Sequence, residues 1–185
     1  MAEYRHIEHG FGPVFDARSR VLVLGSFPSM LSRANAFYYG NPQNRFWHVV
    51  AACVGEPVPP NEGEPLSGAS GGAPATLEQS VEAKRSLLLR HGIALWDVVQ
   101  SCDVRGSSDA SIRNVVPADV ARVMAGARIE AVLCNGGTAA RLYRRHLRPA
   151  TGVDAVQLPS TSPANASWSL GRLTERWREA LGPYL

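Results

Sequence analysis

The chain has 185 residues, of which 45% are hydrophobic and 19% charged, with a formal net charge of +3 and a pI of about 9.0. This length and composition fit one globular domain with a sizeable core, so a single domain is expected over residues 1–185. No apolar run approaches the roughly 20 residues of a membrane span, and the N-terminal stretch MAEYRHIEHGFGPVF lacks the apolar region of a secretory signal. A cytoplasmic protein without a membrane partner is therefore expected.

The predicted elements begin with a short buried strand at 21–24, which runs into a Gly-Ser turn followed by Pro28. Residues 45–55 have helical spacing, and Gly55 is the predicted stop of that helix. The next stretch, 56–76, is dense in proline, glycine and serine. It predicts a flexible insertion within the domain, since neither flank could fold independently.

The rest of the chain alternates helices with strands. Helices are expected over 77–92, 117–127, 138–147 and 169–181, with Pro117 in the first turn of the second. Strands are expected over 93–99 and 129–137 and from 153 onward, with 107–117 as a loop. This alternation predicts an α/β fold of three layers, αβα, around a central, mainly parallel four-stranded sheet.

Polar loops follow each predicted strand. They read GSFPS, WDVVQSCDVRGSSD, CNGG and LPSTSPAN in chain order. In parallel sheets the ligand binds beyond the carboxyl ends of the strands. The four loops therefore predict one site at that edge.

Several chemistries are excluded by absent motifs. The first loop is neither GxxxxGK[ST] nor GxGxxG, and no GxSxG elbow follows a predicted strand. The five histidines, at 6, 9, 48, 91 and 146, all lie outside the strand-end loops, so serine hydrolase chemistry is not expected. The three cysteines are far apart and form no CxxC pair, so no metal site and no cofactor are expected.

What remains is a group of aromatic and amide side chains. Tyr38 and Tyr39 offer flat faces, while Asn41, Asn44 and Asn135 offer donors and acceptors. Stacking combined with hydrogen bonds to a base edge is how a flipped-out nucleobase is held. The alternative for the aromatic residues is burial in the core, which is the interpretation adopted for Phe46 and Trp47 at the start of a helix.

Taken together, the motifs LGSFPS, FYYGNPQNRFW, GIALWDVVQSCDVRGSSDASI, CNGG and LPSTSPAN resemble the uracil-DNA glycosylase superfamily. The branch they resemble most is that of the hypoxanthine-DNA (DNA-deoxyinosine) glycosylases, called family six. The resemblance covers roughly residues 15 to 182, interrupted by the 56–76 insertion. It implies a uracil-DNA glycosylase-like fold and a monofunctional DNA glycosylase of base-excision repair that removes deaminated bases, hypoxanthine first.

The resemblance also implies roles for individual residues. Where the mismatch-specific branch carries a water-binding asparagine in its first loop, this chain has Phe27. In the hypoxanthine branch the catalytic amide is the asparagine of PxNRFW, which is Asn44 here. Tyr39 would stack on the base, and Asn135 with Ser26 and Phe27 would contact its edge. The expected DNA contacts are Ser160, Thr161, Ser162, Pro163, Asn165 and Arg105.

A neutral amide cannot act as a general base as a carboxylate does. Asn44 is therefore expected to orient water and polarise it through its carbonyl oxygen, while the glycosidic bond breaks dissociatively. Three carboxylates lie near predicted strand ends and could assist, namely Asp97, Asp103 and Asp109. Asp97 could equally be a structural cap or a buried hydrogen-bond acceptor.

Two other functions stay open on the sequence alone. One is a uracil or mismatch-specific uracil-DNA glycosylase, and the other is a non-catalytic binder of damaged DNA. The implied partner is double- or single-stranded DNA that contains a deaminated base. The protein is expected to act as a monomer, at the bacterial nucleoid.

Overall fold

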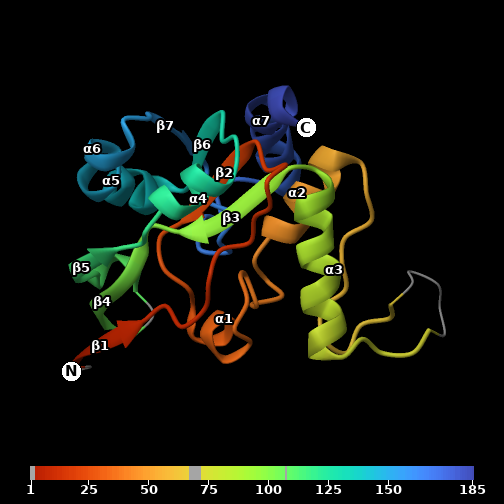
Figure 1. Ribbon diagram of the computed structural model, residues 1–185. Coiled ribbons are helices and arrows are strands. Elements are labelled where there is room, and N and C mark those ends of the chain that lie inside the picture. Colours follow the sequence, from red (N-terminus) through yellow and green to blue (C-terminus); the bar gives the residue numbers. More distant parts are fainter. Residues whose placement is uncertain (1–2, 67–71, 107) are drawn as a thin grey trace.

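The computed structural model describes residues 3–66, 72–106 and 108–185. A parallel sheet with the strand order β3-β2-β6-β7 runs through its centre (Figure 1). The strands are β2 (Val21–Gly25), β3 (Ile93–Asp97), β6 (Ala131–Asn135) and β7 (Ala155–Leu158). All three pairings are parallel, which confirms the predicted α/β fold and its four-stranded sheet.

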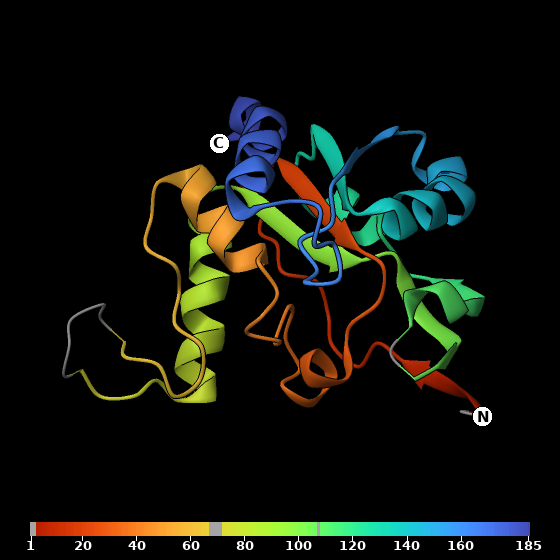
Figure 2. The same cartoon turned by 180° about the vertical axis from the view of Figure 1, so that it is seen from behind.

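Helices cover both faces of this sheet (Figures 1 and 2). One face carries α2 (Phe46–Val54), α3 (Leu77–Arg90) and α7 (Leu170–Leu181). The other carries α4 (Ala121–Gly126), α5 (Gly137–His146) and α6 (Arg148–Thr151). All residues of β2 and β3 are buried, as expected for strands covered on both sides. Within the described residues, no helix has the length and apolarity needed to cross a membrane.

The helix ends follow local rules that the sequence already contains. Thr76 and Gln79 form a capping box at the start of α3, with hydrogen bonds of 3.2 and 2.9 Å between side chains and backbone N–H groups. Gly55 ends α2 in the left-handed conformation, with φ of 72°. The helices predicted over 45–55, 77–92, 138–147 and 169–181 therefore form with small shifts at their ends.

A second, antiparallel sheet was not predicted. It has the order β1-β4-β5, from β1 (Tyr4–Glu8), β4 (Val99–Arg105) and β5 (Arg113–Pro117). The prediction of a loop over 107–117 and of Pro117 inside a helix was wrong, because β5 ends at Pro117 and α4 begins only at Ala121. All five residues of β1 and all five residues of β5 are at least partly exposed. They consequently lack the apolar run by which buried strands are recognised.

Short elements complete the chain. They are α1 (Met30–Ala34), the 3-10 turns η1 (Asp109–Ser111) and η2 (Gly182–Tyr184), and the loop that contains the 56–76 insertion. The described part of that loop is tied together by the Ala75 N–H group, which donates to the Glu64 carbonyl at 2.7 Å. Lys84 of α3 also donates to the Asn61 side chain at 2.9 Å. Residues 67–71, at the centre of the predicted insertion, lie outside the described residues.

Truncating a central side chain should reveal how far stability depends on this sheet. Leu133 of β6 is 1% exposed, so Leu133→Ala is expected to lower the free energy of unfolding by about 2–5 kcal/mol through lost burial and a residual cavity. Val156→Ala, on the half-exposed face of β7, should cost less than about 1 kcal/mol. Urea unfolding of both variants measures the difference, and equal losses would contradict this placement of the core.

Candidate active site

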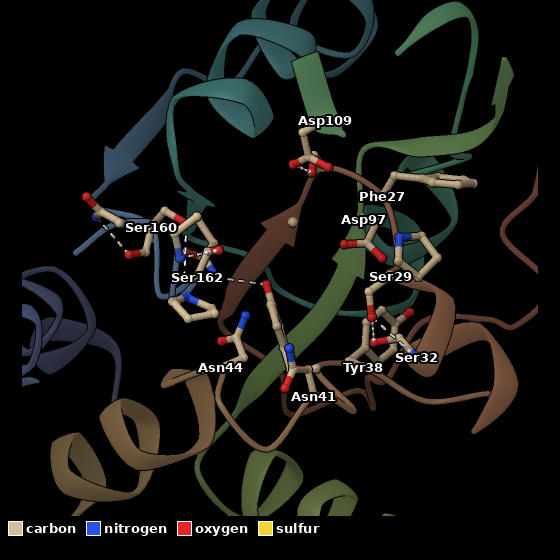
Figure 3. Close-up of a pocket in the computed structure, with 18 of the residues that line it drawn as sticks. Phe27, Ser29, Ser32, Tyr38, Asn41, Asn44, Asp97, Asp109, Ser160 and Ser162 are labelled. Carbon is tan, nitrogen blue, oxygen red and sulfur yellow. Dashed lines mark hydrogen bonds between the residues drawn. The ribbon is translucent and has the colours of Figure 1, made fainter. Parts of the chain in front are cut away.

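A cavity of about 720 Å³ lies beyond the carboxyl ends of the central strands (Figure 3). The last residue of each strand lines it: Gly25 of β2, Asp97 of β3, Asn135 of β6 and Leu158 of β7. In the strand order, β3 lies next to β2 on one side, and β6 and β7 lie on the other side of β2. The direction in which successive strands are added therefore reverses at β2. The cavity therefore occupies the switch point at which open α/β sheets bind their ligands.

A chain of hydrogen bonds forms one wall of the cavity. The Asn135 amide nitrogen donates to the Tyr39 hydroxyl and to the Thr161 hydroxyl, both at 2.9 Å. The Thr161 hydroxyl in turn donates to Asn44 Oδ1 at 2.8 Å. The Thr161 N–H group donates to Asn135 Oδ1 at 3.0 Å, which closes the arrangement. Four residues from three distant segments are thereby fixed relative to one another.

The orientation of the Asn44 amide follows from its partners. Its Oδ1 accepts from the Phe46 N–H group at 3.0 Å as well as from Thr161. A backbone N–H can only donate, so the atom facing it must be the carbonyl oxygen. With two donors already on Oδ1, the group that Asn44 presents to the cavity is its NH₂. The sequence led us to expect that the carbonyl oxygen of Asn44 polarises the water, but that oxygen already accepts two hydrogen bonds.

Arg45 ties the loop after β7 to the start of α2. Its guanidinium donates to the carbonyl oxygens of Thr161, Ser162 and Asn165 at 3.3, 2.7 and 3.1 Å, and also to that of Trp168. The Arg45 N–H group adds a bond to the Thr161 carbonyl at 3.1 Å. Five guanidinium N–H groups in a rigid fork suit several acceptors at once. This side chain therefore sets the shape of the whole 160–168 loop.

Tyr39 is held from behind by the core. Its ring stacks on Phe46 with centroids 4.0 Å apart, and Phe46 packs edge-on against Trp177. The backbone of Tyr39 has φ of 51°, which is uncommon for a residue with a side chain and marks a constrained position. Burial, followed by the charge of Asp97, raises the pKa of the Tyr39 hydroxyl, so this group stays protonated.

Two carboxylates line the cavity on the side opposite Asn44 and Ser160 (Figure 3). Asp97 is 4% exposed, and its Oδ2 lies 2.8 Å from Nε2 of the fully buried His9. Asp109 accepts a 2.6 Å hydrogen bond from the Ser26 hydroxyl, and burial raises the pKa of its carboxyl group. One wall of the cavity is thus built of amides and hydroxyls, and the other contains acidic groups.

Most of the residues singled out from sequence meet at this cavity. The lining includes Ser26, Phe27, Tyr39, Asn44, Asn135, Ser160, Ser162, Pro163 and Asn165. Thr161 is 0% exposed, so its side chain serves the hydrogen-bond chain and is out of reach for the expected DNA contact. Arg105 lies outside the lining, at the exposed end of β4, with its guanidinium over the Tyr4 ring.

Sequence reasoning missed His9 and Arg45. His9 precedes the first predicted strand and belongs to no motif, so nothing in the sequence connects it to Asp97. Arg45 lies inside PQNRFW, next to two aromatic residues assigned to the core. A charged residue in that position is a sequence signal for a buried hydrogen-bonding role. Asp103, expected near the strand ends, lies outside the cavity lining and pairs with His6 and Asn114 on the second sheet.

No group of three or more histidine, cysteine, aspartate or glutamate side chains is arranged to hold a metal ion within residues 3–66, 72–106 and 108–185. The three cysteines are free thiols. Burial raises their pKa values, to about 11 for Cys53 and Cys102 and to about 12 for Cys134. Each is therefore a protonated thiol near neutral pH.

Comparison with known proteins connects this cavity to a family. The model of the uracil DNA glycosylase superfamily matches residues 13–181. A protein of Methanosarcina acetivorans named hypoxanthine DNA glycosylase is 31% identical over 169 residues, which cover 91% of this chain and 95% of that protein. One of the same name from Methanosarcina barkeri is 30% identical over 177 residues, covering 94% and 97%.

A solved structure agrees with these relatives. It is the solution NMR structure of a Methanosarcina acetivorans protein provisionally described as a uracil DNA glycosylase. The two folds superpose with a TM-score of 0.72 at 29% sequence identity, and the match covers 96% of this chain and 97% of the other. The match therefore spans the segments that form both sheets.

Gly25 is the position where the floor of the cavity tolerates no side chain. A β-carbon there would lie 2.2 Å from Asp97 Oδ1 and 3.1 Å from the Tyr39 hydroxyl oxygen. Gly25→Ala is therefore expected to lower the free energy of unfolding by about 1–3 kcal/mol. Gly171→Ala, with nothing within 4 Å in α7, should be neutral or slightly stabilising. Thermal unfolding compares the two, and an unchanged Gly25→Ala protein would contradict the close approach of Asp97.

The role assigned to Arg45 can be measured by amide hydrogen exchange. Arg45→Lys keeps the charge but replaces the fork by one ammonium group, so exchange of amides in 160–168 should become faster. Arg172→Lys is the matched control, since Arg172 donates only one bond to this loop, to the Ser167 carbonyl at 3.1 Å. Unaltered protection in Arg45→Lys would show that the loop holds its shape without the guanidinium.

Proposed function

This chain belongs to the uracil DNA glycosylase superfamily and is a DNA glycosylase, and we propose that hypoxanthine is the deaminated base it releases first. The observation that carries hydrolysis at this cavity is the Asn44 amide, fixed by Thr161 and Phe46 with its NH₂ group toward the cavity. The names of the two Methanosarcina relatives support hypoxanthine as the base. The reaction would be hydrolysis of the N-glycosidic bond, leaving an abasic site.

The cavity suits a flipped nucleotide. The base would enter toward Gly25 and Asp97 and stack on Tyr39, while the sugar and phosphates stay at the mouth. Ser160, Ser162, Pro163 and Asn165 lie at this mouth on the loop shaped by Arg45. We assign them the contacts to the DNA strand, with Arg105 as a more distant phosphate contact. Ser26, Phe27 and Asn135 complete the surroundings of the base.

The chemical step fits a dissociative path. The bond between C1′ and the base nitrogen breaks, and the electron pair leaves with the base, which then takes a proton from solvent. The sugar passes through an oxocarbenium-like state, and a water adds to C1′ and then loses a proton. An NH₂ donor can hold this water by its oxygen without accepting its proton, which suffices when the electrophile is a cation. Asn44 therefore positions the water.

The same cavity supports a monofunctional enzyme. The one lysine of the chain, Lys84, lies on α3 outside the cavity lining, with its ammonium near the Trp47 ring. A Schiff base with the sugar requires an amine at C1′. Strand cleavage by a lyase step is accordingly not part of the proposal. We also propose that the protein works as a monomer on DNA of the bacterial nucleoid, in the cytoplasm.

A second candidate is release of uracil. It is favoured by the description of the solved Methanosarcina structure as a uracil DNA glycosylase. Uracil and hypoxanthine both present a carbonyl beside a ring N–H, so one polar cavity could accept either. The distinction between them lies in the base that is released fastest.

Duplex oligonucleotides with one hypoxanthine, uracil, xanthine or thymine mismatch test the proposal when alkali reveals the abasic sites. Asn44→Ala is expected to slow release of hypoxanthine by about 10²-fold, the usual cost of one lost donor in an active site. Gln43→Ala, an exposed neighbour outside the cavity lining, should leave the rate unchanged.

The other outcomes are equally informative. Faster release of uracil than of hypoxanthine would replace the proposed base by the second candidate. Binding of damaged duplex without any abasic product would show a binder in place of an enzyme and would remove the role given to Asn44.

A further inference from the structure

Beneath the cavity lies a buried hydrogen-bond partner of Asp97 that no motif predicts. His9 is 0% exposed and its Nε2 lies 2.8 Å from Asp97 Oδ2. We propose that His9 holds Asp97 as a charged acceptor for the ring N–H that deaminated bases carry, so that this pair decides which bases the cavity accepts. The inference rests on the proposed function and specifies how its site would select the base.

The surroundings of His9 determine which atom carries its proton. Phe11, Tyr38 and Phe27 enclose the ring, with centroids 4.3, 5.9 and 6.3 Å away. Its Nδ1 has no hydrogen-bond partner among the described residues. A buried N–H without a partner is rarer and more costly than a bare acceptor. The proton therefore belongs on Nε2, which donates to Asp97, and the carboxylate keeps the negative charge.

Asp97 has one oxygen left for a ligand. Its Oδ2 is used by His9, whereas no hydrogen-bond donor within the described part of the chain is assigned to Oδ1. The point that a β-carbon of Gly25 would occupy lies only 2.2 Å from Oδ1. Glycine at this position therefore leaves the carboxylate open to the cavity, whose lining includes Asp97 (Figure 3). Burying a charge in this manner is costly unless something binds it.

The chemistry of the bases matches this acceptor. Hypoxanthine, xanthine and uracil each carry a ring N–H beside a carbonyl, whereas adenine and cytosine have a bare ring nitrogen there. A fixed carboxylate accepts a hydrogen bond from the ring N–H of the first group and repels the lone pair on the bare ring nitrogen of adenine or cytosine. Sites built to hydrogen-bond a substrate group discriminate strongly against analogues that lack it. Guanine and thymine also have this N–H, so the contact separates the deaminated bases from adenine and cytosine, while guanine and thymine must be excluded by other parts of the cavity.

The depth of Asp97 argues against a role in activating water. The sugar and phosphates of a flipped nucleotide stay at the cavity mouth, so C1′ lies there and the far edge of the base lies deepest. Asp97 ends a fully buried strand and is 4% exposed. A carboxylate at that depth reaches the base edge and not C1′. His9 is accordingly a positioning residue that acts through Asp97.

The chain contains a matched pair for comparison. His6 and Asp103 also form a histidine–aspartate contact at 2.9 Å, but His6 is exposed and Asp103 lies outside the cavity lining. This pair belongs to the antiparallel sheet, where His6 on β1 is registered opposite Asp103 on β4. It has the same chemical groups without access to the cavity, so substitutions there control for changes in charge alone.

The test compares single-turnover release of hypoxanthine and of 1-methylhypoxanthine, which lacks the N–H, from otherwise identical duplexes. The wild-type protein should release hypoxanthine at least about tenfold faster. In Asp97→Asn, His9 still donates to the side-chain oxygen, so an NH₂ replaces the acceptor in the cavity. Release of hypoxanthine should then fall selectively and the preference should drop to about twofold or less. Asp103→Asn should retain the wild-type preference.

Variants of His9 test its positioning role. His9→Leu removes the donor and should lower the preference, while His9→Gln supplies a side-chain N–H and should restore part of it. A merely structural role would change stability in both variants without changing the ratio of the two rates. Circular dichroism shows whether each variant is folded.

Other results would overturn the inference. Equal rates on the two bases in the wild type, or an Asp97→Asn protein that loses both activities by the same factor, would show that Asp97 does not contact the N–H. Release of hypoxanthine itself tests the proposed function separately. Should uracil be the base released, uracil and 3-methyluracil replace the purine pair. Should no base be released, binding of the same duplexes is compared in their place.

Discussion

The Arg45 side chain is the interaction on which the geometry of the site depends. One guanidinium binds four carbonyl oxygens of a loop without regular structure, from Thr161 to Trp168. The Ser162 and Asn165 carbonyls also accept turn hydrogen bonds from the Asn165 and Trp168 N–H groups. The loop has no strand or helix ladder, so the arginine adds the bonds that regular secondary structure would supply. Because Arg45 follows Asn44 directly, the same contact brings the hydroxyl of Thr161 to the Asn44 amide.

The cavity built on this contact has two unlike walls. One is a closed chain of neutral donors and acceptors, in which the orientation of every amide is dictated by a partner. The other holds Asp97 above His9 and Asp109 beside Ser26. Neutral amides and hydroxyls can position a water molecule at the sugar without taking its proton. A buried carboxylate suits recognition of an N–H group on the base.

The parallel sheet could be predicted because β2, β3 and most of β6 are buried on both faces and therefore appear as uninterrupted apolar runs, as in 21–24. The helices could be predicted because Thr76, Gly55 and similar residues mark their ends. The antiparallel sheet could not, because β1 and β5 have open faces and β1 pairs with β4 across a long sequence separation. Pro117 belonged to such a strand, and local propensity alone favoured a helix start there.

The sequence by itself determined the fold class and the set of polar loops that meet at the site, because strand ends in a parallel sheet lie at one edge whatever their separation along the chain. It also contained Asn44 and Tyr39 within a recognisable motif. Only the tertiary structure decided which atom of Asn44 faces the cavity, since this depends on the donors of Phe46 and Thr161. Only the tertiary structure paired His9 with Asp97, because a contact across 88 residues depends on packing, which no local pattern encodes.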